Sequence, residues 1–311
     1  MVQMTSPGAI PEQAVGPLRA ALSQAALREA EKIGEGYATV AYRVPDRSGD
    51  WSVRIPRVEA DWAIPGLERE LRLLPALARY IDTAETPRDA RLVLADDGTV
   101  VAAVHRYVPG RQLSSRSVRG RRRDRLAEQL GAFLSQLHGF PLDQARELGV
   151  PERDLWEDHY QPLIEQALPY LGNSAQRWLT TQADAFVAGG ATRSAPGVLI
   201  HGDISGDHLL LDGDSGLGGV IDFGDAMISD PALDLAGILN DMAEPFLAQV
   251  LEHYTGVLDD DAPRRIQFYI QVEAIHQVIY GDRVHNGRER TTGVRRLAAK
   301  AASELRYHGS F

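Results

Sequence analysis

The sequence predicts an α+β fold of two lobes, a small β-rich lobe followed by a larger, mainly helical one. The length of 311 residues exceeds the size, roughly 250–300 residues, at which a single hydrophobic core stops growing. Short apolar runs bounded by turn residues gather before residue 108, whereas apolar residues at helical spacing dominate after it. We therefore expect one lobe at 1–108, a second at 109–311, and a cleft between them.

The composition excludes several classes of protein. The formal net charge of −10 argues against binding of nucleic-acid phosphates and favours cationic small molecules. The absence of cysteine excludes disulfides, thiolate metal sites and cysteine nucleophiles. No basic segment precedes an apolar run at the start, and no stretch approaches the roughly 18 apolar residues of a membrane span. We expect a cytoplasmic monomer or weak dimer that binds neither nucleic acid nor membrane.

The first lobe is predicted to be a small antiparallel sheet with one helix, preceded by a helical lead-in over 12–32. Turn-forming residues at 45–50 and 96–98 separate pairs of strand-like runs, which is typical of hairpins. A run with apolar residues at helical spacing lies between the hairpins, and Pro75 should kink or shorten that helix. The expected strands are 37–44, 51–55, 91–94 and 100–108, and the expected helix is 66–80.

The second lobe is predicted to be helical with one β-rich island, because short apolar runs separated by Gly and Asp lie between 198 and 222. An arginine run at 116–125 opens the first helix. No aromatic residues interleave it, so a solvated helix start explains it better than nucleic-acid binding. The expected helices are 119–138, 153–171, 174–189 and those from 231 to the end.

The β-rich island contains the residues that indicate a chemistry. Asp203 lies in a loop after a short apolar strand, where a carboxylate can point at a reacting hydroxyl. Asp222 follows another apolar strand and precedes Phe-Gly, an arrangement that grips a divalent cation bridging nucleotide phosphates. Each acid alone is a common turn residue. Together, His-Gly-Asp at 201–203, a ligand-type His208 and Asp-Phe-Gly at 222–224 predict phosphoryl transfer.

These motifs resemble those of the aminoglycoside phosphotransferases and their relatives, a family with a protein-kinase-like fold. The segments 201–211 and 221–231 are similar to the aminoglycoside 2″-phosphotransferase branch, and macrolide phosphotransferases share the histidine at position 208, where most members have Asn. The resemblance spans residues 33 to about 290. It implies a two-lobed, kinase-like fold and ATP or GTP as the phosphoryl donor.

The same resemblance implies roles for the residues of the island. Asp203 would be the catalytic base or the residue that orients the hydroxyl, and His208 and Asp222 would bind Mg²⁺. Because Mg²⁺ prefers oxygen donors, direct ligation by His208 and a role one step removed from the metal both stay open. Ser205 would touch substrate or shape the loop. Asp234 would brace the catalytic loop.

The first lobe supplies candidates for nucleotide binding. Gly34 and Gly36 lie in a glycine-rich turn, where absent side chains let the backbone close over phosphates. The family places a cation on the strand 51–57, usually Lys. Since the only lysines are Lys32 and Lys300, this cation must be Arg54 here.

Other residues of the first lobe are further candidates for nucleotide binding. Arg57 would point to the opposite face of its strand from Arg54 and is the weaker candidate cation. A helix carboxylate should orient Arg54, and we favour Glu70 over Glu68 because leucines follow it as they do in the family. The hinge at 104–110, which contains Arg106 and Val108, would hold the purine edge through its backbone.

Acidic residues of the later helices are the candidates for acceptor binding. In the aminoglycoside branch such acids replace the hydration shell of a polyamine sugar. Asp241, Glu244 and Glu273 lie in the corresponding region, with Asp282 as a further acid. Neutral Asn240 and Pro245 depart from the acidic character of that branch.

The expected function is therefore NTP- and Mg²⁺-dependent transfer of the γ-phosphoryl group to a hydroxyl of a small-molecule antibiotic, which would inactivate it. An aminoglycoside is the first candidate acceptor. The alternatives are a macrolide, a nucleoside antibiotic, or a metabolite such as choline or a sugar. A nucleotide-binding pseudokinase is a further alternative, against which the intact Asp203 and Asp222 argue. A protein kinase is disfavoured because little room follows Asp222 for a peptide-docking segment.

Overall fold

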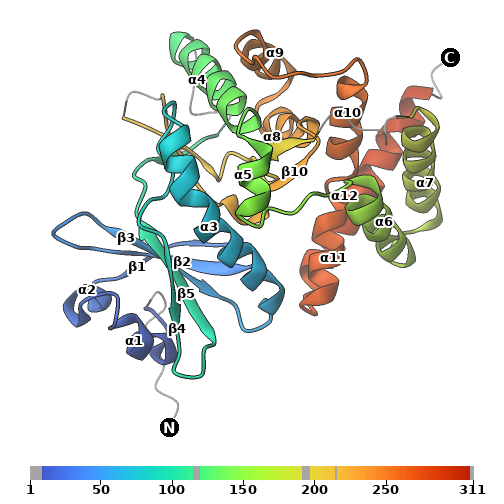
Figure 1. Cartoon of the computed structure of the whole chain (residues 1–311). Coiled ribbons are helices and arrows are strands. Elements are labelled where there is room, and N and C mark those ends of the chain that lie inside the picture. Colours follow the sequence, from blue (N-terminus) through green and yellow to red (C-terminus); the bar gives the residue numbers. More distant parts are fainter. Residues whose placement is uncertain (1–8, 115–119, 191–196, 214–215, 309–311) are drawn as a thin grey trace.

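The computed structural model of the protein describes residues 9–114, 120–190, 197–213 and 216–308. A β-sheet with two short helices lies at one end of the molecule, most of the helices lie at the other, and α3 (Ile64–Tyr80) lies between them (Figure 1). This arrangement confirms the predicted α+β fold with a sheet in the first third and helices after it.

The sheet of the first lobe is antiparallel, with strand order β1-β2-β3-β5-β4. Both predicted hairpins are confirmed, since β2 pairs with β3 and β4 with β5. One face buries Val44, Val53 and Val104 against Leu18 of α1 (Glu12–Leu18) in a separate small core. The strands are β1 (Glu31–Glu35), β2 (Thr39–Val44), β3 (Trp51–Pro56), β4 (Arg91–Leu94) and β5 (Val100–Arg106).

The predicted helical lead-in is wrong at its end. It consists of two short helices, α1 (Glu12–Leu18) and α2 (Gln24–Arg28), and strand β1 already begins at Glu31. β1 is an edge strand with mainly exposed, charged side chains, so it shows no alternating apolar pattern. Backbone pairing with β2 stabilises this strand, and that pairing leaves no local signal in the sequence.

Helix α3 (Ile64–Tyr80) joins the two lobes. It continues through Pro75, so the expected shortening does not occur. Leu73, Leu74 and Leu77 are buried on both sides of the proline, and this burial offsets the hydrogen bond that proline cannot donate. These leucines belong to the same core as the helices of the second lobe rather than to the core of the sheet.

The second lobe is helical, as predicted, but the expected helix at 153–171 is broken into shorter turns. A π-helical turn at Trp156–Tyr160 leads into α6 (Gln161–Ala167) and a 3₁₀ turn at Leu168–Tyr170. A short helix, α5 (Leu142–Glu147), was not predicted. The other helices are α4 (Arg121–His138), α7 (Asn173–Ala188), α8 (Ala232–Met242), α9 (Glu244–Glu252), α10 (Ala262–Val272), α11 (Ile275–Arg283) and α12 (Gly287–His308).

Two small sheets form the β-rich island and position its loops. The strands β7 (Val198–Ile200) and β10 (Met227–Ser229) pair with each other, and β8 (Leu209–Leu211) lies between β6 (Arg111–Gln112) and β9 (Leu217–Val220). The loop from β7 to β8 carries Asp203 and His208, whereas the loop from β9 to β10 carries Asp222. The sequence did not predict β6 or β10, since each is very short.

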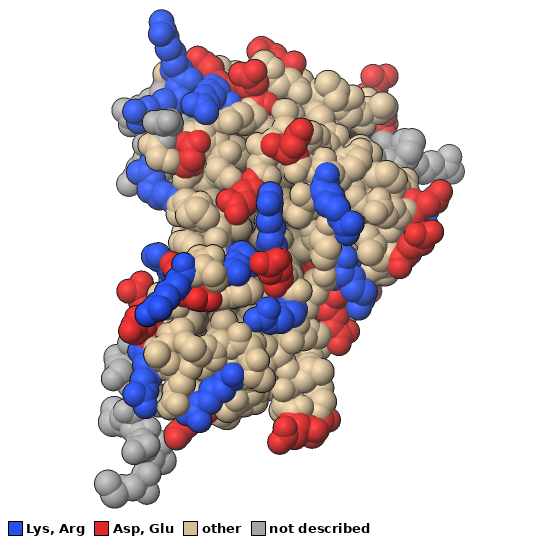
Figure 2. All heavy atoms as spheres, turned by 60° about the vertical axis from the view of Figure 1, so that its left-hand side comes forward, with Lys and Arg blue, Asp and Glu red and all other residues tan. Residues whose placement is uncertain are grey.

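The surface mixes charges of both signs. Basic side chains gather at the upper end of the face in Figure 2, and acidic and basic side chains alternate along its middle. Part of the predicted arginine run, at 116–119, lies outside the described residues, and α4 begins at Arg121. Among the helices that the structure describes, none is long and apolar enough to cross a membrane.

Candidate active site

The carboxylate of Asp234 in α8 braces the loop between β7 and β8, as predicted. The Asp234 carboxylate is buried and accepts hydrogen bonds from the backbone N–H groups of His201, at 2.8 Å, and Gly202, at 2.9 Å. Gly202 has a φ of +83°, and a Cβ at this position would lie 2.4 Å from the carbonyl oxygen of Asp225. Only glycine therefore allows the turn that precedes Asp203.

His201 ties the two loops of the site together. Its buried imidazole donates from Nε2 to the carbonyl oxygen of Ile221, at 2.9 Å, and its Nδ1 accepts from the backbone N–H of Asp203, at 3.3 Å. Burial lowers the pKa of His201, so the ring is neutral and this pattern of one donor and one acceptor is satisfied. The ring fixes Asp203 relative to the strand end that precedes Asp222.

Asp203, His208 and Asp222 come together, as the resemblance implies. The Nδ1 of His208 donates to the carbonyl oxygen of Asp203, at 2.7 Å, and lies 3.5 Å from the Asp203 Oδ2. Its Nε2 lies 3.6 Å from the Asp222 Oδ2. Attraction to these two carboxylates outweighs the burial that acts to lower the pKa of His208, so that pKa lies above its ordinary value.

The two carboxylates of the site differ in how they bind protons. Desolvation by the surrounding protein raises the pKa of Asp203 to about 7, even though the side chain is 56% exposed and His208 favours its charged form. Burial acts to raise the pKa of Asp222 as well, but Arg54 and His208 outweigh it and hold that pKa at about 2. One carboxylate can therefore exchange a proton near neutrality while the other stays charged.

Arg54 of β3 connects the first lobe to this site. Its Nη1 lies 2.6 Å from the Glu70 Oε2 and its Nη2 lies 2.6 Å from the Asp222 Oδ1. Glu70 is buried, and its Oε1 also accepts from the backbone N–H of Phe223, at 3.1 Å. The structure thus places Glu70, and not Glu68, against Arg54. Asp222 has a φ of 69°, a left-handed conformation unusual for a residue other than glycine.

The glycine-rich turn is braced by Arg57. The backbone N–H of Gly36 donates to the carbonyl oxygen of Thr39, at 2.9 Å, which closes the turn between β1 and β2. Arg57 donates from Nε to the carbonyl oxygen of Gly36, at 2.9 Å, and pairs with Glu35. Gly34 lies in β1, where the register with β2 shifts. Arg57 therefore holds the turn rather than sharing the role of Arg54.

Arg106 and Val108, the two candidates of the predicted hinge, have different surroundings. The guanidinium of Arg106 pairs with Asp89, at 3.0 Å, and lies over the ring of Trp51, 4.0 Å from its centre. The backbone N–H of Arg106 donates to the carbonyl oxygen of Arg88, at 2.8 Å. Val108 is buried against β9, so closely that a Cβ on Gly219 would lie 2.4 Å from its Cγ1. Val108 is thus packed against a strand of the β-rich island.

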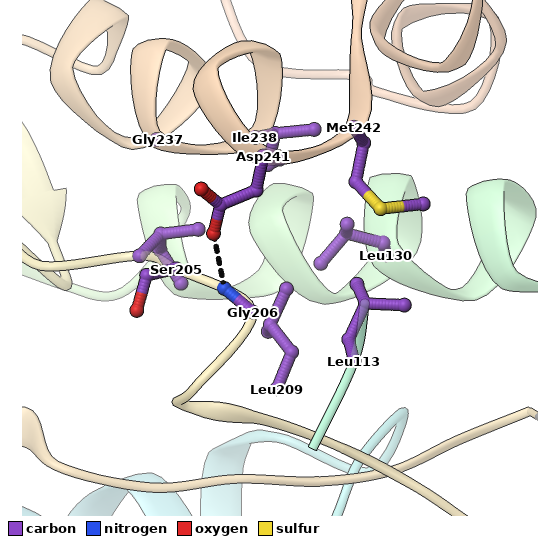
Figure 3. Close-up of a pocket in the computed structure, with 10 residues that line it drawn as sticks. Leu113, Leu130, Ser205, Gly206, Leu209, Gly237, Ile238, Asp241 and Met242 are labelled. Atoms are coloured by element: carbon purple, nitrogen blue, oxygen red, sulfur yellow. Dashed lines mark hydrogen bonds between the residues drawn. The ribbon is translucent and has the colours of Figure 1, made fainter. Parts of the chain in front are cut away.

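Asp241 and Ser205 lie at the loop between β7 and β8, the loop that carries Asp203. The Asp241 carboxylate points at the loop and accepts from the backbone N–H of Gly206, at 2.6 Å (Figure 3). A Cβ on Gly206 would lie 2.4 Å from the carbonyl oxygen of Leu113, so this approach requires glycine. The Ser205 Oγ lies 3.4 Å from the His208 Nδ1. One oxygen of Asp241 is therefore already used to hold the loop.

The other two acceptor candidates lie farther along the helices. Glu244 is exposed at the start of α9. Glu273 lies between α10 and α11, and its Oε2 pairs with the Arg296 Nη2, at 2.5 Å. Asp282 pairs with Arg290, at 3.0 Å. Glu273 and Asp282 are therefore each already paired with an arginine.

Two residues of the site were missed by sequence reasoning. His138, buried in α4, lies with its Nε2 3.2 Å from the Asp234 Oδ2 and its Nδ1 2.8 Å from the Tyr254 hydroxyl. Arg69 donates from Nη2 to the carbonyl oxygen of Gly224, at 2.6 Å. A histidine among the apolar positions of a helix was a weak signal for His138. Arg69 has no such signal, because its local sequence is that of an ordinary exposed arginine on a helix.

The fit of a divalent cation rests on two facing atoms, the Asp222 Oδ2 and the His208 Nε2. Within the described ranges, no group of three or more His, Asp or Glu side chains is arranged to hold a metal ion. Mg²⁺ at phosphate-transfer sites is commonly bound by one or two carboxylates together with phosphate oxygens and water. The residues present therefore fit a cation that arrives with nucleotide phosphates rather than one held by protein alone.

Comparison with known proteins agrees with this geometry. The model of the phosphotransferase enzyme family matches residues 29–269, a range that includes the glycine-rich turn, Arg54, Glu70 and both loops of the island. Among curated proteins, viomycin phosphotransferase from Streptomyces vinaceus is 26% identical over 174 residues. That match covers 54% of this chain and 59% of the relative, so the chain spans only about three fifths of that relative's length.

Solved structures give similarity over nearly the whole chain. The GDP and kanamycin complex of APH(2″)-IIia is 28% identical, with a TM-score of 0.82 over 94% of this chain and 99% of that one. The macrolide 2′-phosphotransferase MphH from Brachybacterium faecium is 19% identical, with a TM-score of 0.66 over 86% of this chain and 91% of that one. The second similarity shows the shared fold alone.

Proposed function

The chain belongs to the phosphotransferase enzyme family, and from that premise we propose that it transfers the γ-phosphoryl group of ATP or GTP to a hydroxyl group of a small-molecule antibiotic. The observation that carries the proposal is the meeting of Asp203, His208 and Asp222 from two separate loops, with Arg54 of the first lobe bonded to Asp222. A proton acceptor, metal ligands and a phosphate-binding cation are the groups that phosphoryl transfer requires.

Asp203 is the residue that we assign to the acceptor hydroxyl. Its carboxylate is exposed, and a pKa of about 7 suits a group that accepts and releases a proton near neutrality. As the acceptor oxygen bonds to the γ-phosphorus, the bond from that phosphorus to the β–γ bridging oxygen breaks and nucleoside diphosphate leaves. The hydroxyl proton passes to the Asp203 carboxylate and then to solvent.

Arg54 and Glu70 are the residues that we assign to the nucleotide phosphates. Arg54 donates to Glu70 through Nη1 and to Asp222 through Nη2. Phosphate oxygens compete with Asp222 for Nη2, whereas buried Glu70 keeps Nη1 in place. The planar fork of a guanidinium suits phosphate, so Arg serves here where the related enzymes carry Lys.

The nucleotide lies, in this proposal, between lobes that divide at residues 108 and 109. Gly34 and Gly36 cover its phosphates, and the backbone near Val108 contacts the purine edge. Val108 supports that boundary because it packs against Gly219 of the second lobe. The backbone N–H of Arg106 is already bonded within the first lobe, so Arg106 contributes through its neighbours rather than by its own N–H.

Aminoglycosides are our first candidate for the acceptor, and viomycin is the second. The solved relative with a TM-score of 0.82 is a complex with kanamycin, and the curated relative is named for viomycin. A net charge of −10 favours cationic acceptors. Ser205, Asp241, Glu244 and Glu273 are the residues that we assign to this face of the site. Inactivation of the antibiotic by phosphorylation would confer resistance.

Mg²⁺, when bound with the nucleotide, would neutralise charge on the phosphates, and we assign Asp222 and His208 to hold it. We expect His208→Ala to raise the metal concentration needed for half-maximal activity by about 10- to 100-fold. His208→Asn, which offers an amide oxygen, should keep most of the Mg²⁺-supported rate. The measurement is a metal titration of turnover with Mg²⁺ and with Mn²⁺. An unchanged titration of the alanine variant would show that His208 does not bind the metal.

The test of the proposed function is phosphorylation of antibiotics by the purified full chain. The protein is incubated with Mg²⁺ and either ATP or GTP, and with kanamycin, viomycin, a macrolide or a nucleoside antibiotic, and products are followed by mass spectrometry. We expect a product heavier by one phosphate with a cationic antibiotic. Nucleotide binding without any phosphorylated product from this panel would overturn the antibiotic function and favour a metabolite acceptor and, after that, the pseudokinase alternative.

A further inference from the structure

Two aromatic side chains of the first lobe are exposed and both meet the same helix of the second lobe. Tyr37 is 45% exposed and Trp62 is 39% exposed. The ring of Tyr37 lies on that of Tyr280, with centroids 3.8 Å apart and an interplanar angle of 30°. The guanidinium of Arg283 lies over the ring of Trp62, 5.3 Å from its centre. Both Tyr280 and Arg283 belong to α11.

Helix α11 offers a firm support for these contacts. Tyr280 and Arg283 are three positions apart, so they lie on one face of the helix. Other positions of the helix, Ile275, Val278 and Ile279, are buried in the core of the second lobe. The side chains that meet the first lobe are therefore anchored to a packed element.

The two partners in the first lobe belong to the parts that we assign to the nucleotide. Tyr37 follows Gly36 at the tip of the glycine-rich turn, whose backbone Arg57 holds through the Gly36 carbonyl oxygen. Trp62 lies in the 3₁₀ turn Asp61–Ala63 immediately before α3, the helix that carries Glu70. Helix α11 thus contacts both the turn over the phosphates and the start of the helix that orients Arg54.

The surroundings of Tyr37 place this contact beside an acceptor candidate. Burial raises the pKa of the Tyr37 phenol, and the carboxylates of Glu289 and Glu273 raise it further. The phenol of Tyr37 therefore stays neutral at ordinary pH. Glu273, which we assign to the acceptor, lies at the C-cap of α10, just before α11.

We propose that α11 is an interlobe latch, in which Tyr280 and Arg283 grip Tyr37 and Trp62 and hold the first lobe closed over the site. The latch positions the glycine-rich turn for transfer, and none of its four residues is a catalytic residue. Its effect on turnover rests on the proposed function, whereas its effect on the glycine-rich turn does not.

The test mutates a residue of the second lobe and measures hydrogen exchange in the first lobe. Hydrogen exchange of the amides at 34–38 is measured in the free, full-length protein for Tyr280→Ala and for the matched ring-keeping control Tyr280→Phe. We expect exchange at 34–38 to become about two- to twelve-fold faster in the alanine variant, the factor expected for loss of an aromatic pair. The phenylalanine variant should match the wild type. Equal exchange in all three proteins would overturn the latch.

A double-mutant cycle separates the latch from general destabilisation. Tyr37→Ala and Tyr280→Ala should each speed exchange at 34–38, and the double variant should be no faster than the faster single variant, because both remove one contact. If exchange at 34–38 in the double variant were faster by the product of the two single-variant factors, the two rings would act independently and the pairing of Tyr37 with Tyr280 would be rejected. Arg283→Ala should speed exchange at 61–64 in the same way, and unchanged exchange there would remove the second half of the latch.

Turnover tests the consequence of the latch for catalysis. With an acceptor found in the antibiotic panel, Tyr280→Ala should lower kcat by about two- to twelve-fold, whereas Tyr280→Phe restores it. Faster exchange with unchanged kcat would show that the contact exists but does not position the turn for transfer, which overturns that part of the proposal. Because exchange requires no acceptor, a failed panel would reject the antibiotic function and leave the contact itself tested.

Discussion

Asp203→Asn is expected to lower kcat for phosphoryl transfer by about 10²–10⁴-fold, the range of a lost general base, while nucleotide binding stays close to that of the wild type. The amide cannot accept the hydroxyl proton, yet its size and its backbone hydrogen bond to His201 are preserved. The measurements are kcat by mass detection of the phosphorylated product and nucleotide Kd by titration calorimetry.

The matched control for this prediction is Asp207→Asn, which removes a charge from the same loop. Asp207 is exposed, and its carbonyl oxygen rather than its carboxylate binds Gln112. We expect its kcat to stay within about three-fold of the wild type, since surface charges away from the reacting atoms contribute little. Equal activity of Asp203→Asn and wild type would reject Asp203 as the residue that handles the proton.

Arg54→Met is expected to lower both stability and nucleotide affinity. Removal of the guanidinium leaves Glu70 buried without its partner and Asp222 without one of its charge-assisted hydrogen bonds. Breaking a buried ion pair by removing one partner costs about 3–5 kcal/mol in the free energy of unfolding. Urea unfolding measures that loss, and calorimetric titration should show nucleotide binding at least about ten-fold weaker, as expected for a lost charge-assisted contact to phosphate.

Two further variants separate charge from packing at this position. Arg54→Lys keeps the charge but cannot bond both carboxylates through a planar fork, so it should fall between the wild type and Arg54→Met. Adding Glu70→Gln to Arg54→Met should recover part of the lost stability, because the buried carboxylate is no longer charged. If the double variant is less stable than Arg54→Met alone, the pairing of Arg54 with Glu70 does not explain the loss.

Strong local signals predicted much of the fold. Turn residues at 45–50 and 96–98 lie between strands that do form hairpins, and amphipathic spacing located α4 and α7. Weak signals failed for physical reasons. The charged edge strand β1 is stabilised by backbone pairing, and Pro75 is tolerated because leucines on both sides are buried.

The candidate site shows the same division. The order of the motifs predicted that Asp203, His208 and Asp222 act together, and the structure places them within hydrogen-bonding or near-contact distance. The order of residues in the sequence does not reveal two other contacts of the site. Asp241 binds the backbone of Gly206, and Arg57 binds the backbone of the glycine-rich turn. Acids on helices and arginines on strands have the same local pattern whether they bind substrate, brace a loop or face water.

The sequence by itself determined the fold class and the family resemblance, and that resemblance, in a chain whose only lysines are Lys32 and Lys300, made Arg54 the candidate for the phosphate-binding cation. Only the tertiary structure decided that Glu70 rather than Glu68 meets Arg54, and that Tyr37 meets Tyr280. Local propensity acts over a few residues, whereas these contacts join segments far apart in the chain. Their distances depend on how α3 and α11 pack into the common core, and that packing is a property of the whole fold.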